Sequence, residues 1–545
     1  MPRIFHVQSL AVRSRFGPAE TRGPSPDASR RRDVNSPWQQ NARYQRRLIH
    51  PPRAVIDIGS NTIRLVIYEG TARAPEIVWN EKVAARLGRD LSTTGRIPPE
   101  AMEEALAALA RYALLVSDRR IENVQTVATA AARDAQNGDE FLARVAELGL
   151  EPRLLSGEEE ARISAFGAIG AFPGARGMVA DLGGGSLELV SIGDGQARDA
   201  LSLPFGTLRL SALCAGDESL DDTVTKALAD AGWIASHEGP LYMIGGTWRA
   251  FAHYAMQETG YPLTDPHAFV LSVEEARRIA DKVIEETPEN LELVPGVSPM
   301  RAGFLSDAAS LLRVLLDQLK PKYLVFSSWG IREGLLFTGL SPLLRAQDPL
   351  LAAVHVYGEA RDAAVTDAAR VAGWTVELAN GAGKRNERLR LASAQLAAAL
   401  QRVEPNLRVD HAVEWALDKR WIDCTPRDRA MICAAMFGSL GRTSLPDRVT
   451  QLADTKDLRE ALTWGLGFRL ARRLGAGSRA ALGMSRLRVK KKSLVLYLDD
   501  SRSALATWPL TRDLEFLAEW IERRPKIKTG DFDFDDEFSD EEEEE

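Results

Sequence analysis

The chain has 545 residues, which is enough for three or four domains of ordinary size. Its hydrophobic content of 45% and charged content of 27% are those of a globular protein, and no apolar run approaches the roughly 18 to 20 residues that span a bilayer. The three cysteines, Cys214, Cys424 and Cys433, are widely spaced, so they predict neither a zinc site nor a disulfide framework and favour a reducing, cytoplasmic compartment.

Charge is concentrated at the two ends of the chain. The first fifty residues carry ten arginines against three acids, whereas residues 531–545 carry eleven acids and no base. Neither composition can bury a core. We therefore expect an Arg-rich disordered extension over residues 1–50 and an acidic disordered tail over residues 529–545. The extension has the composition of a transit peptide but lacks the apolar stretch of a secretory signal.

Regular structure is predicted to begin near residue 53 with two apolar strands, 54–61 and 63–68, that form a hairpin. An amphipathic helix follows over residues 99–117. A strand at 123–129, a helix at 138–148, a strand at 152–155 and a helix from residue 157 complete this first section.

A second section repeats the opening design. Residues 178–186 form an apolar strand that ends in Asp-Leu-Gly-Gly-Gly-Ser, and a strand resumes at 187–192. The pattern of strand, Asp, apolar residue, Gly and small polar residue therefore occurs twice, which predicts two similar half-domains that face each other. A strand with a glycine loop at 241–247 leads into a helix, and a strand at 323–328 precedes a helix that begins near residue 330.

From about residue 350 the alternation of strands and helices stops. Helical patterns occupy residues 361–379, 387–402, 409–417, 428–440 and 456–474, followed by a short strand at 493–499. We therefore expect a mostly helical C-terminal domain. The predicted domain boundaries are 51–176, 177–345 and 346–528.

The two Asp-Gly loops predict a site for a metal ion and phosphate. Glycine permits positive φ and close approach of the backbone to a ligand, and successive amides in such a turn bind anions. An aspartate beside them, Asp57 or Asp181, suits a hydrated divalent cation that faces phosphate oxygens. An ordinary Asx turn is the alternative reading of one loop alone, but the repeat favours a shared site. The predicted loop residues are Gly59, Ser60, Asn61, Gly183, Gly184, Gly185, Ser186, Gly245, Gly246 and Thr247.

A glutamate run at the start of the helix near residue 157 supplies a general base. Ser156 and Glu159 fit a capping box, and acids in a first helical turn also suit the helix dipole. This structural role leaves Glu160 unassigned. Because no Ser, Cys or His nucleophile motif is present, Glu160 is the candidate to deprotonate an attacking water.

Three further residues are candidates for phosphate contact. Thr129 and Arg133 lie where a strand ends and a helix begins, and Arg133 can bind phosphate through its guanidinium fork. Arg64 follows the first loop and either reaches phosphate or faces solvent. A surface salt bridge is the alternative reading of Arg133.

The motifs together resemble the exopolyphosphatase and guanosine pentaphosphate phosphohydrolase family, often called Ppx/GppA. The segments that carry the resemblance are AVIDIGSNTIRLVIY, ATAAARDAQN, LLSGEEEARISAFGAI, VADLGGGSLELV, PFGTLRL, IGGT and WGIREGLL. The resemblance implies the fold of the actin-like ATPase superfamily, an α/β architecture of two RNase-H-like subdomains with a cleft between them. It also implies Mg²⁺ or Mn²⁺ as cofactor.

The resemblance implies roles for individual residues. Glu160 matches the family's catalytic base, and Asp181 and Glu188 match acidic positions that serve metal and water. Asp57 joins them as a third candidate metal ligand. The family's C-terminal helical domain resembles HD-type phosphohydrolases, but here the pair is reversed, as Asp410-His411, which argues against a working second metal site in that domain.

The first hypothesis for the function is release of terminal phosphate from inorganic polyphosphate, and the second is hydrolysis of guanosine pentaphosphate. A polyanion needs a basic path, for which residues 469–479 and 486–492 are candidates. A non-catalytic polyphosphate or nucleotide sensor and an actin-like sugar kinase are the alternatives of other classes. The retained acids argue against the sensor, and the kinase lacks an identifiable sugar or adenosine site. No nucleic acid or membrane partner is expected, and a homodimer is in keeping with the family.

Overall fold

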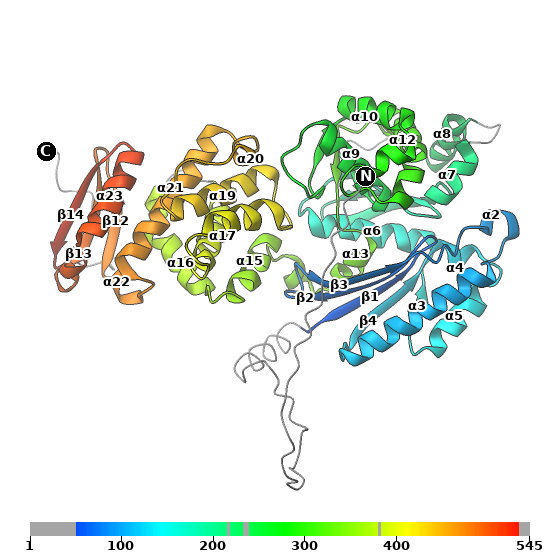
Figure 1. The fold of residues 1–545 in the computed structure, drawn as a ribbon, viewed down its shortest axis with the longest axis horizontal. Coiled ribbons are helices and arrows are strands. Elements are labelled where there is room, and N and C mark those ends of the chain that lie inside the picture. Colours follow the sequence, from blue (N-terminus) through cyan, green and yellow to red (C-terminus); the bar gives the residue numbers. More distant parts are fainter. Residues whose placement is uncertain (1–50, 215–218, 233–238, 380–382, 533–545) are drawn as a thin grey trace, which may run out of the picture. The chain divides into compact units, whose positions relative to one another are not determined.

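The computed structural model describes residues 51–214, 219–232, 239–379 and 383–532 (Figure 1). The predicted Arg-rich extension and nearly all of the predicted acidic tail lie outside these residues. The described part contains three sheets, and the two larger ones carry the hairpins predicted from the Asp-Gly motifs. No described helix combines the length and apolar character that crossing a membrane requires.

The first sheet has five strands in the order β3-β2-β1-β4-β5. Strand β1 is central, pairs antiparallel with β2 and parallel with β4, and so places the end of β1 beside the end of β4. Helices α3 and α5 pack on one face of this sheet around Ile56, Leu65 and Phe141. The bounds are β1 Arg53–Ile58, β2 Ile63–Glu69, β3 Glu76–Val83, α2 Leu91–Thr94, α3 Pro99–Asp118, β4 Asn123–Ala128, α4 Ala130–Asp134, α5 Gly138–Glu147, β5 Pro152–Leu154 and α6 Gly157–Ala171.

The second sheet has six strands in the order β10-β11-β9-β6-β7-β8. Here β6 pairs antiparallel with β7 and parallel with β9, as β1 does with β2 and β4. The bounds are β6 Gly177–Leu182, β7 Leu187–Gly193, β8 Gln196–Leu203, α7 Thr207–Cys214, α8 Leu220–Ala231, β9 Leu241–Ile244, α9 Gly246–Glu258, β10 Val270–Ser272, α10 Val273–Glu285, α11 Pro288–Glu292, α12 Pro299–Leu319, β11 Tyr323–Phe326, α13 Ile331–Thr338 and α14 Pro342–Arg345.

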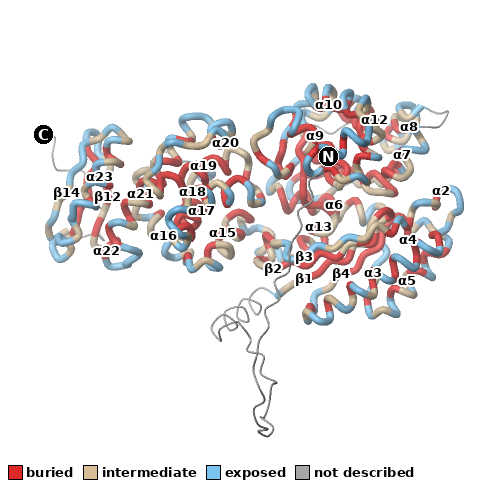
Figure 2. The backbone as a smooth tube through the Cα atoms, viewed as in Figure 1, coloured by how far each residue is buried: buried red, intermediate tan, exposed pale blue. Residues whose placement is uncertain are grey.

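The repeated hairpin predicted from the sequence is therefore confirmed as a repeated sheet. Each copy has three antiparallel strands followed on the other side by parallel ones, with an added antiparallel strand, β10, in the second. The central strand β1 is buried along nearly its whole length, and β4 is buried over its second half (Figure 2). This is an α/β fold with mixed sheets.

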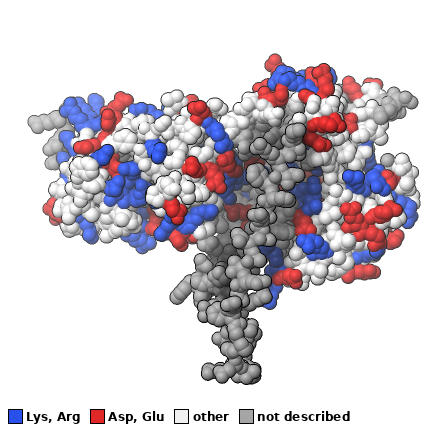
Figure 3. Space-filling view, in the orientation of Figure 1, with Lys and Arg blue, Asp and Glu red and all other residues white. Residues whose placement is uncertain are grey.

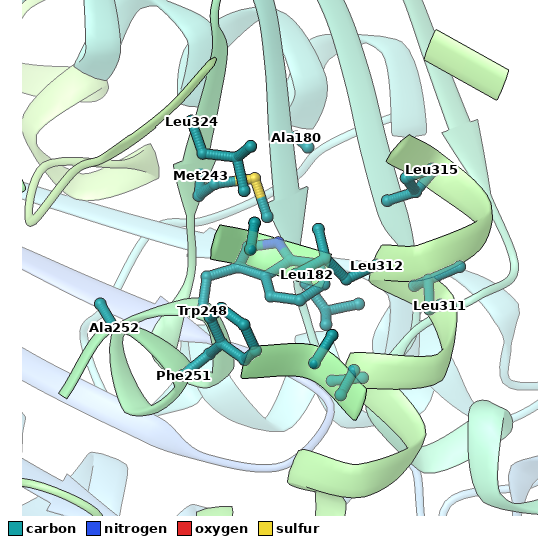
Figure 4. Close-up of a cluster of buried hydrophobic side chains, with 14 of the residues drawn as sticks. Ala180, Leu182, Met243, Trp248, Phe251, Ala252, Leu311, Leu312, Leu315 and Leu324 are labelled. Carbon is teal, nitrogen blue, oxygen red and sulfur yellow. The ribbon is translucent and has the colours of Figure 1, made fainter. Parts of the chain in front are cut away.

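Apolar packing holds the second sheet against its helices. Met243 and Leu324 on neighbouring strands meet Trp248 of α9 and Leu312 of α12 in one buried cluster (Figure 4). All four side chains are excluded from solvent. Burial of such side chains contributes about 1.5–3 kcal/mol each, so this cluster stabilises the positions of the strand ends of the second sheet.

Helices α6 and α13 cross each other between the two larger sheets. Helix α6 packs on the second sheet through Ala165 and α13 packs on the first through Leu335. The crossing is close because glycines meet there. A Cβ on Gly167 would lie 2.3 Å from the carbonyl oxygen of Gly330, and one on Gly334 would lie 1.8 Å from that of Ile163. Each helix thus covers the sheet of the other half, which holds α6 beside both Asp-Gly loops.

The remaining part begins as a set of helices, as predicted. The predicted helix at 361–379 is shorter than expected, because α16 stops at Trp374 and a 3-10 turn follows. The bounds are α15 Pro349–Glu359, α16 Val365–Trp374, α17 Lys384–Leu400, α18 Arg408–Val413, a π-helical turn Glu414–Asp418, α19 Pro426–Ser439, α20 Asp447–Thr450, α21 Thr455–Gly475 and α22 Arg479–Gly483.

The end of this mostly helical part contains more strand than predicted. The predicted strand at 493–499 is the centre of a three-stranded sheet, β12-β13-β14, backed by helix α23. The edge strands were missed because they are short and their few apolar residues, Leu487 and Val489 in β12 and Ile527 in β14, alternate with Arg and Lys. The bounds are β12 Ser485–Val489, β13 Ser493–Asp499, α23 Trp508–Trp520 and β14 Arg524–Gly530.

An HD-type metal site is not confirmed in this part. His411 lies on α18 and its Nδ1 lies 2.8 Å from the carboxylate of Glu414, one turn further along. Within the described ranges, no group of three or more His, Cys, Asp or Glu side chains is close enough to hold a metal ion.

Candidate active site

A pocket opens where the ends of β1, β6 and β9 meet, and its cavity volume is about 140 Å³. It brings together the residues predicted from both Asp-Gly loops, the glycine loop after β9 and the glutamate of α6. Its lining residues are Asp57, Gly59, Ser60, Asn61, Thr62, Arg64, Thr129, Ala130, Glu160, Asp181, Leu182, Gly183, Gly184, Gly185, Ser186, Glu188, Ile244, Gly245, Gly246, Arg249, Arg301, Gly330, Ile331 and Arg332.

The two Asp-Gly loops are the same turn. The amide of Gly59 donates to the carbonyl of Thr62 at 3.1 Å, and the amide of Gly183 donates to that of Ser186 at 3.0 Å. The loops also pack on each other. A Cβ on Gly185 would lie 2.8 Å from Oγ of Ser60. The glycines of the second loop are thus required for close approach of the first loop, in addition to any contact with a ligand.

The glycine loop after β9 needs its two glycines for different reasons. Gly245 has φ of +114°, and a Cβ there would lie 2.5 Å from the carbonyl oxygen of Leu182. A Cβ on Gly246 would lie 2.5 Å from the guanidinium of Arg301. Any larger residue would displace either the end of β6 or an arginine of the pocket.

Glu160 is half-buried, whereas Glu158 and Glu159 of the same run are exposed. The capping box is confirmed: the amide of Ser156 donates to Glu159 at 2.9 Å and that of Glu159 donates to Oγ of Ser156 at 3.2 Å. Glu158 pairs with Arg162 at 2.8 Å on the exposed side of the helix. Only Glu160 of the three lines the pocket. Burial raises the pKa of Glu160 to about 7, against the opposing effect of Arg133.

The acids of the second hairpin lie in the same pocket. Burial raises the pKa of Glu188 well above its usual range, and Glu160 and Asp181 raise it further. Ser202 of β8 donates a hydrogen bond to Glu188 at 3.0 Å. Burial also raises the pKa of Asp181, whose carboxylate accepts from Oγ of Ser164 on α6. Each of these two carboxylates is therefore held by a serine from a neighbouring element.

Asp57 completes the predicted set of acids. Burial raises the pKa of its carboxyl, against the opposing charges of Arg332 and Arg64. A guanidinium nitrogen of Arg332 lies 3.9 Å from the carboxylate. Asp57, Asp181 and Glu188 share the pocket, but no three such side chains are close enough in the described structure to enclose a metal ion.

Two of the predicted phosphate-contacting residues do not line the pocket. Arg133 donates to Glu160 at 3.1 Å and to the carbonyl of Leu155 at 3.0 Å, so its guanidinium is engaged with the candidate base. Thr247 is fully buried, and its Oγ1 accepts from Arg301 at 2.7 Å. Both residues thus contact pocket side chains instead of the pocket itself.

The predicted basic path also lies apart from the pocket. Arg469 and Arg473 both bind the carboxylate of Asp513, each at 2.9 Å, and Arg472 donates to the carbonyl of Ser439 at 3.0 Å. The sequence shows only that these arginines are close together. It does not show that Asp513 and the carbonyl of Ser439, which are remote in sequence, already bind them.

Arginines of the second half are the residues that sequence reasoning missed. Arg249 of α9, Arg301 of α12 and Arg332 of α13 line the pocket together with Arg64. Burial lowers the pKa of Arg249 to about 9 and that of Arg64 to about 10. A signal existed for Arg249 and Arg332, because each lies in the first turn of a helix that follows a strand and a glycine. Arg301 arrives from a helix remote in sequence and had no such signal.

Comparison with known proteins places these motifs in a family. The sequence model described as the Ppx/GppA phosphatase family matches residues 66–342. Exopolyphosphatase 2 of Mycobacterium tuberculosis is 30% identical over 291 residues, which are 49% of this chain and 91% of that protein. Retrograde regulation protein 2 of Saccharomyces cerevisiae is 29% identical over 345 residues, which are 56% of this chain and 58% of that protein.

Solved structures match the same part of the chain. A Ppx/GppA family member from Aquifex aeolicus superposes with a TM-score of 0.46 at 28% identity, over 55% of this chain and 99% of that one. An exopolyphosphatase from Cytophaga hutchinsonii superposes with a TM-score of 0.47 at 23% identity, over 55% of this chain and 99% of that one. Because the family model covers half of the sequence, the chain belongs to the Ppx/GppA phosphatase family and is a phosphoanhydride hydrolase.

Proposed function

We propose that the chain is an exopolyphosphatase, which releases terminal orthophosphate from inorganic polyphosphate by direct attack of water. The observation that carries this proposal is the position of the half-buried Glu160, which lines a pocket together with both Asp-Gly loops. A family relative, exopolyphosphatase 2 of Mycobacterium tuberculosis, bears the name of this activity.

In the proposed reaction Glu160 orients a water molecule and accepts its proton. The water oxygen forms a bond to the terminal phosphorus as the bond from that phosphorus to the bridging oxygen breaks. The products are orthophosphate and a chain one phosphate shorter. A pKa near 7 suits this role, because a base is most effective when its pKa is near the working pH. Burial and the charge of Glu160 both raise the pKa of Glu188. We assign Glu188 as the second acid, which positions the water.

We propose that Asp57 and Asp181 hold Mg²⁺ or Mn²⁺. Both are hard oxygen donors that line the pocket, and burial raises the pKa of each. The charge of Asp57 also raises the pKa of Asp181, so a bound cation would relieve their repulsion. Two carboxylates are enough for Mg²⁺, which usually completes its shell with water and phosphate oxygens. When bound, the ion would neutralise charge on the transferred phosphate.

The loops and arginines are assigned to the phosphate chain. Amides of the two glycine turns are suited to phosphate oxygens, and Arg64, Arg249, Arg301 and Arg332 supply positive charge from four different elements. Their convergence in one buried pocket would otherwise be unfavourable, since burial and mutual repulsion both lower the pKa of Arg249. A polyanion removes that cost.

The lining favours polyphosphate over guanosine pentaphosphate. The pocket lining contains no aromatic side chain among the described residues, so it offers no ring for a purine to stack on. A cavity of about 140 Å³ is also below the roughly 300–1,000 Å³ of sites that enclose drug-sized ligands. It suits a few phosphate groups.

The decisive experiment measures phosphate release from long-chain polyphosphate and from guanosine pentaphosphate side by side. We expect a kcat/KM at least ten-fold higher for polyphosphate. A higher kcat/KM for guanosine pentaphosphate would contradict the proposed substrate and would favour the nucleotide instead. Release from neither substrate by folded protein with Mg²⁺ would contradict both.

Glu160→Gln tests the mechanism in the same assay. We expect kcat to fall by about 10²–10⁴-fold, the range for loss of a general base, with polyphosphate binding nearly unchanged. Glu158→Gln is the matched control, because Glu158 lies two residues away and pairs with Arg162 outside the pocket. Near-normal turnover by Glu160→Gln would contradict the proposal that Glu160 is the general base.

We also propose domain boundaries at residues 176/177 and 345/346. The first sheet ends before residue 177, and the second sheet with its helices ends before residue 346. These boundaries place one Asp-Gly hairpin in each of the first two domains.

A further inference from the structure

A row of three charged side chains crosses the first sheet at the end where the pocket lies. Asp57 of β1 stands opposite Arg64 of β2, and Arg64 stands opposite Lys82 of β3. Residues in register on neighbouring strands point to the same face of a sheet. Asp57 and Arg64 both line the pocket, so Lys82 belongs to the pocket face, although it does not line the pocket itself.

The residues beside this row pack on the other face of the sheet. Leu65, which follows Arg64, belongs to the buried cluster with α3. Glu81, which precedes Lys82, pairs with Arg111 of α3 at 2.7 Å. Because side chains alternate along a strand, Arg64 and Lys82 point away from α3.

Lys82 lies among other cations. Burial lowers its pKa, and the charges of Arg64 and Arg301 lower it further, so both guanidiniums lie near its ammonium group. Lys82 is exposed and forms no ion pair with a described residue, since the acid of the row, Asp57, pairs with Arg332 at 3.9 Å. On the face shown in Figure 3, acidic and basic side chains are interspersed over the described surface. Neighbouring cations without an acidic partner are therefore a local feature of this row.

The row leads from the pocket to the edge of the sheet. Neighbouring strands lie about 4.8 Å apart, so Lys82 stands about 10 Å from Asp57 across the sheet. Strand β3 is an edge strand, and most of its residues are exposed. A single phosphate group held at Asp57 would not reach Lys82, whereas a chain of phosphates would.

We propose that Lys82 binds the polyphosphate chain behind the phosphates held in the pocket, so that the chain leaves the pocket across β2 and over the edge strand β3. This inference rests on the proposed function, because it takes polyphosphate as the substrate. Lys82 contacts the substrate away from the reacting atoms, so it adds affinity without acting in the chemical step. It is thus a determinant of specificity for long chains.

Steady-state phosphate release from long-chain polyphosphate tests the role of Lys82 in a series of charges. Lys82→Gln should raise KM about three- to ten-fold with kcat unchanged, the effect of losing one partly exposed charge contact. Lys82→Arg keeps the charge and should behave like the unmodified chain, and Lys82→Glu should raise KM further than Lys82→Gln.

Lys226→Gln is the matched control, because it removes an exposed lysine from helix α8. We expect its KM to equal that of the unmodified chain. An unchanged KM in Lys82→Glu would overturn the proposal. Equal increases in Lys82→Gln and Lys226→Gln would also overturn it, because they would show attraction to net charge alone.

A short competitor separates a path for the chain from a contact inside the pocket. Pyrophosphate is too short to reach from the pocket to Lys82, so its inhibition constant against phosphate release should be the same in Lys82→Gln and in the unmodified chain. If Lys82→Gln weakens pyrophosphate and the long chain equally, Lys82 acts at the pocket, and the proposed path across β2 and β3 is wrong.

The unmodified chain distinguishes failure of this proposal from failure of the proposed function. Absence of phosphate release by the unmodified chain would contradict the proposed function. Fluorescence anisotropy with labelled long-chain polyphosphate then tests Lys82 without turnover, and we expect Lys82→Gln to raise Kd about three- to ten-fold. Release by the unmodified chain with the same KM in every Lys82 variant would contradict the role of Lys82 alone.

Discussion

The two Asp-Gly hairpins share one backbone design and differ in the charge that stands opposite the aspartate. In the first hairpin Asp57 pairs in register with Arg64, whereas in the second Asp181 pairs with Glu188. The turns close with equivalent hydrogen bonds, from Gly59 and from Gly183. One position, seven residues after the aspartate, is thus a cation in one copy and an anion in the other.

From this difference we infer that the two copies of the hairpin have different tasks. Backbone geometry sets where the side chains at the hairpin ends lie, and both ends line the same pocket. The side chain at the equivalent position then decides the chemistry. The first hairpin offers charge that suits phosphate, and the second offers a carboxylate beside Glu160 that suits a water molecule.

The largest expected effect is a split between the two equivalent positions. Glu188→Gln should lower kcat by about 10²–10⁴-fold with little change in KM, because it removes an acid assigned to the attacking water. Arg64→Gln should instead raise KM by roughly ten-fold or more, because it removes a phosphate contact. Steady-state phosphate release measures both. Equal effects on kcat and KM in the two variants would show that the hairpins are not divided in this way.

The two aspartates should respond alike. Asp57→Ala and Asp181→Ala should each raise the Mg²⁺ concentration for half-maximal activity by about ten-fold or more, since each removes one of the two proposed ligands. A titration of activity against Mg²⁺ measures this change. Asp194→Ala, an exposed acid on the turn between β7 and β8, is the control. Undiminished activity of the unmodified chain in excess chelator would contradict a metal at either hairpin.

The dependence of activity on pH tests whether Glu160, which lies in the pocket with both hairpins, acts as the base. Burial raises the pKa of Glu160 to about 7. The mechanism that we propose needs its deprotonated form, so kcat/KM should fall about ten-fold per pH unit below this value. Arg133 opposes the rise, so Arg133→Gln should move the acidic limb to higher pH. Titration of the substrate is common to both profiles and cancels in their ratio. If the acidic limb of the Arg133→Gln profile does not move, the titration of Glu160 does not control kcat/KM.

The smallest expected effect concerns the contact between the two loops. Gly185→Ala brings a methyl group within 2.8 Å of Ser60, so the loops must move apart. We expect a loss of about 1–3 kcal/mol in the free energy of unfolding, in line with overpacking of a close contact. Gly303→Ala on α12 is the control, because a Cβ there meets nothing within 4 Å. Thermal unfolding compares the two, and equal melting temperatures would show that the loops tolerate separation.

Local sequence signals were sufficient for the hairpins and for the candidate base. Apolar strands broken by Asp-Gly turns predicted both hairpins, and the predicted start of each of the four strands agrees with the structure within one residue. The capping box singled out Glu160 because it assigned Glu159 to the helix end, and both hydrogen bonds of that box are present. Such features depend on residues within one turn of the chain, so they can be read without knowledge of the fold.

Signals that depend on remote contacts were misread or absent. Arg133 has the right chemistry to bind phosphate, yet it is engaged with Glu160 and Leu155. The edge strands of the C-terminal sheet are short and have few apolar residues, which alternate with basic ones, and only their pairing with β13 makes them strands.

The sequence by itself determined the repeated hairpin, the glycine loops and the choice of Glu160, because each rests on interactions between near neighbours along the chain. The tertiary structure alone decided that Arg249, Arg301 and Arg332 converge on one pocket, since they come from three helices separated in sequence. Strand register and helix packing bring such residues together, and neither is encoded in any short segment.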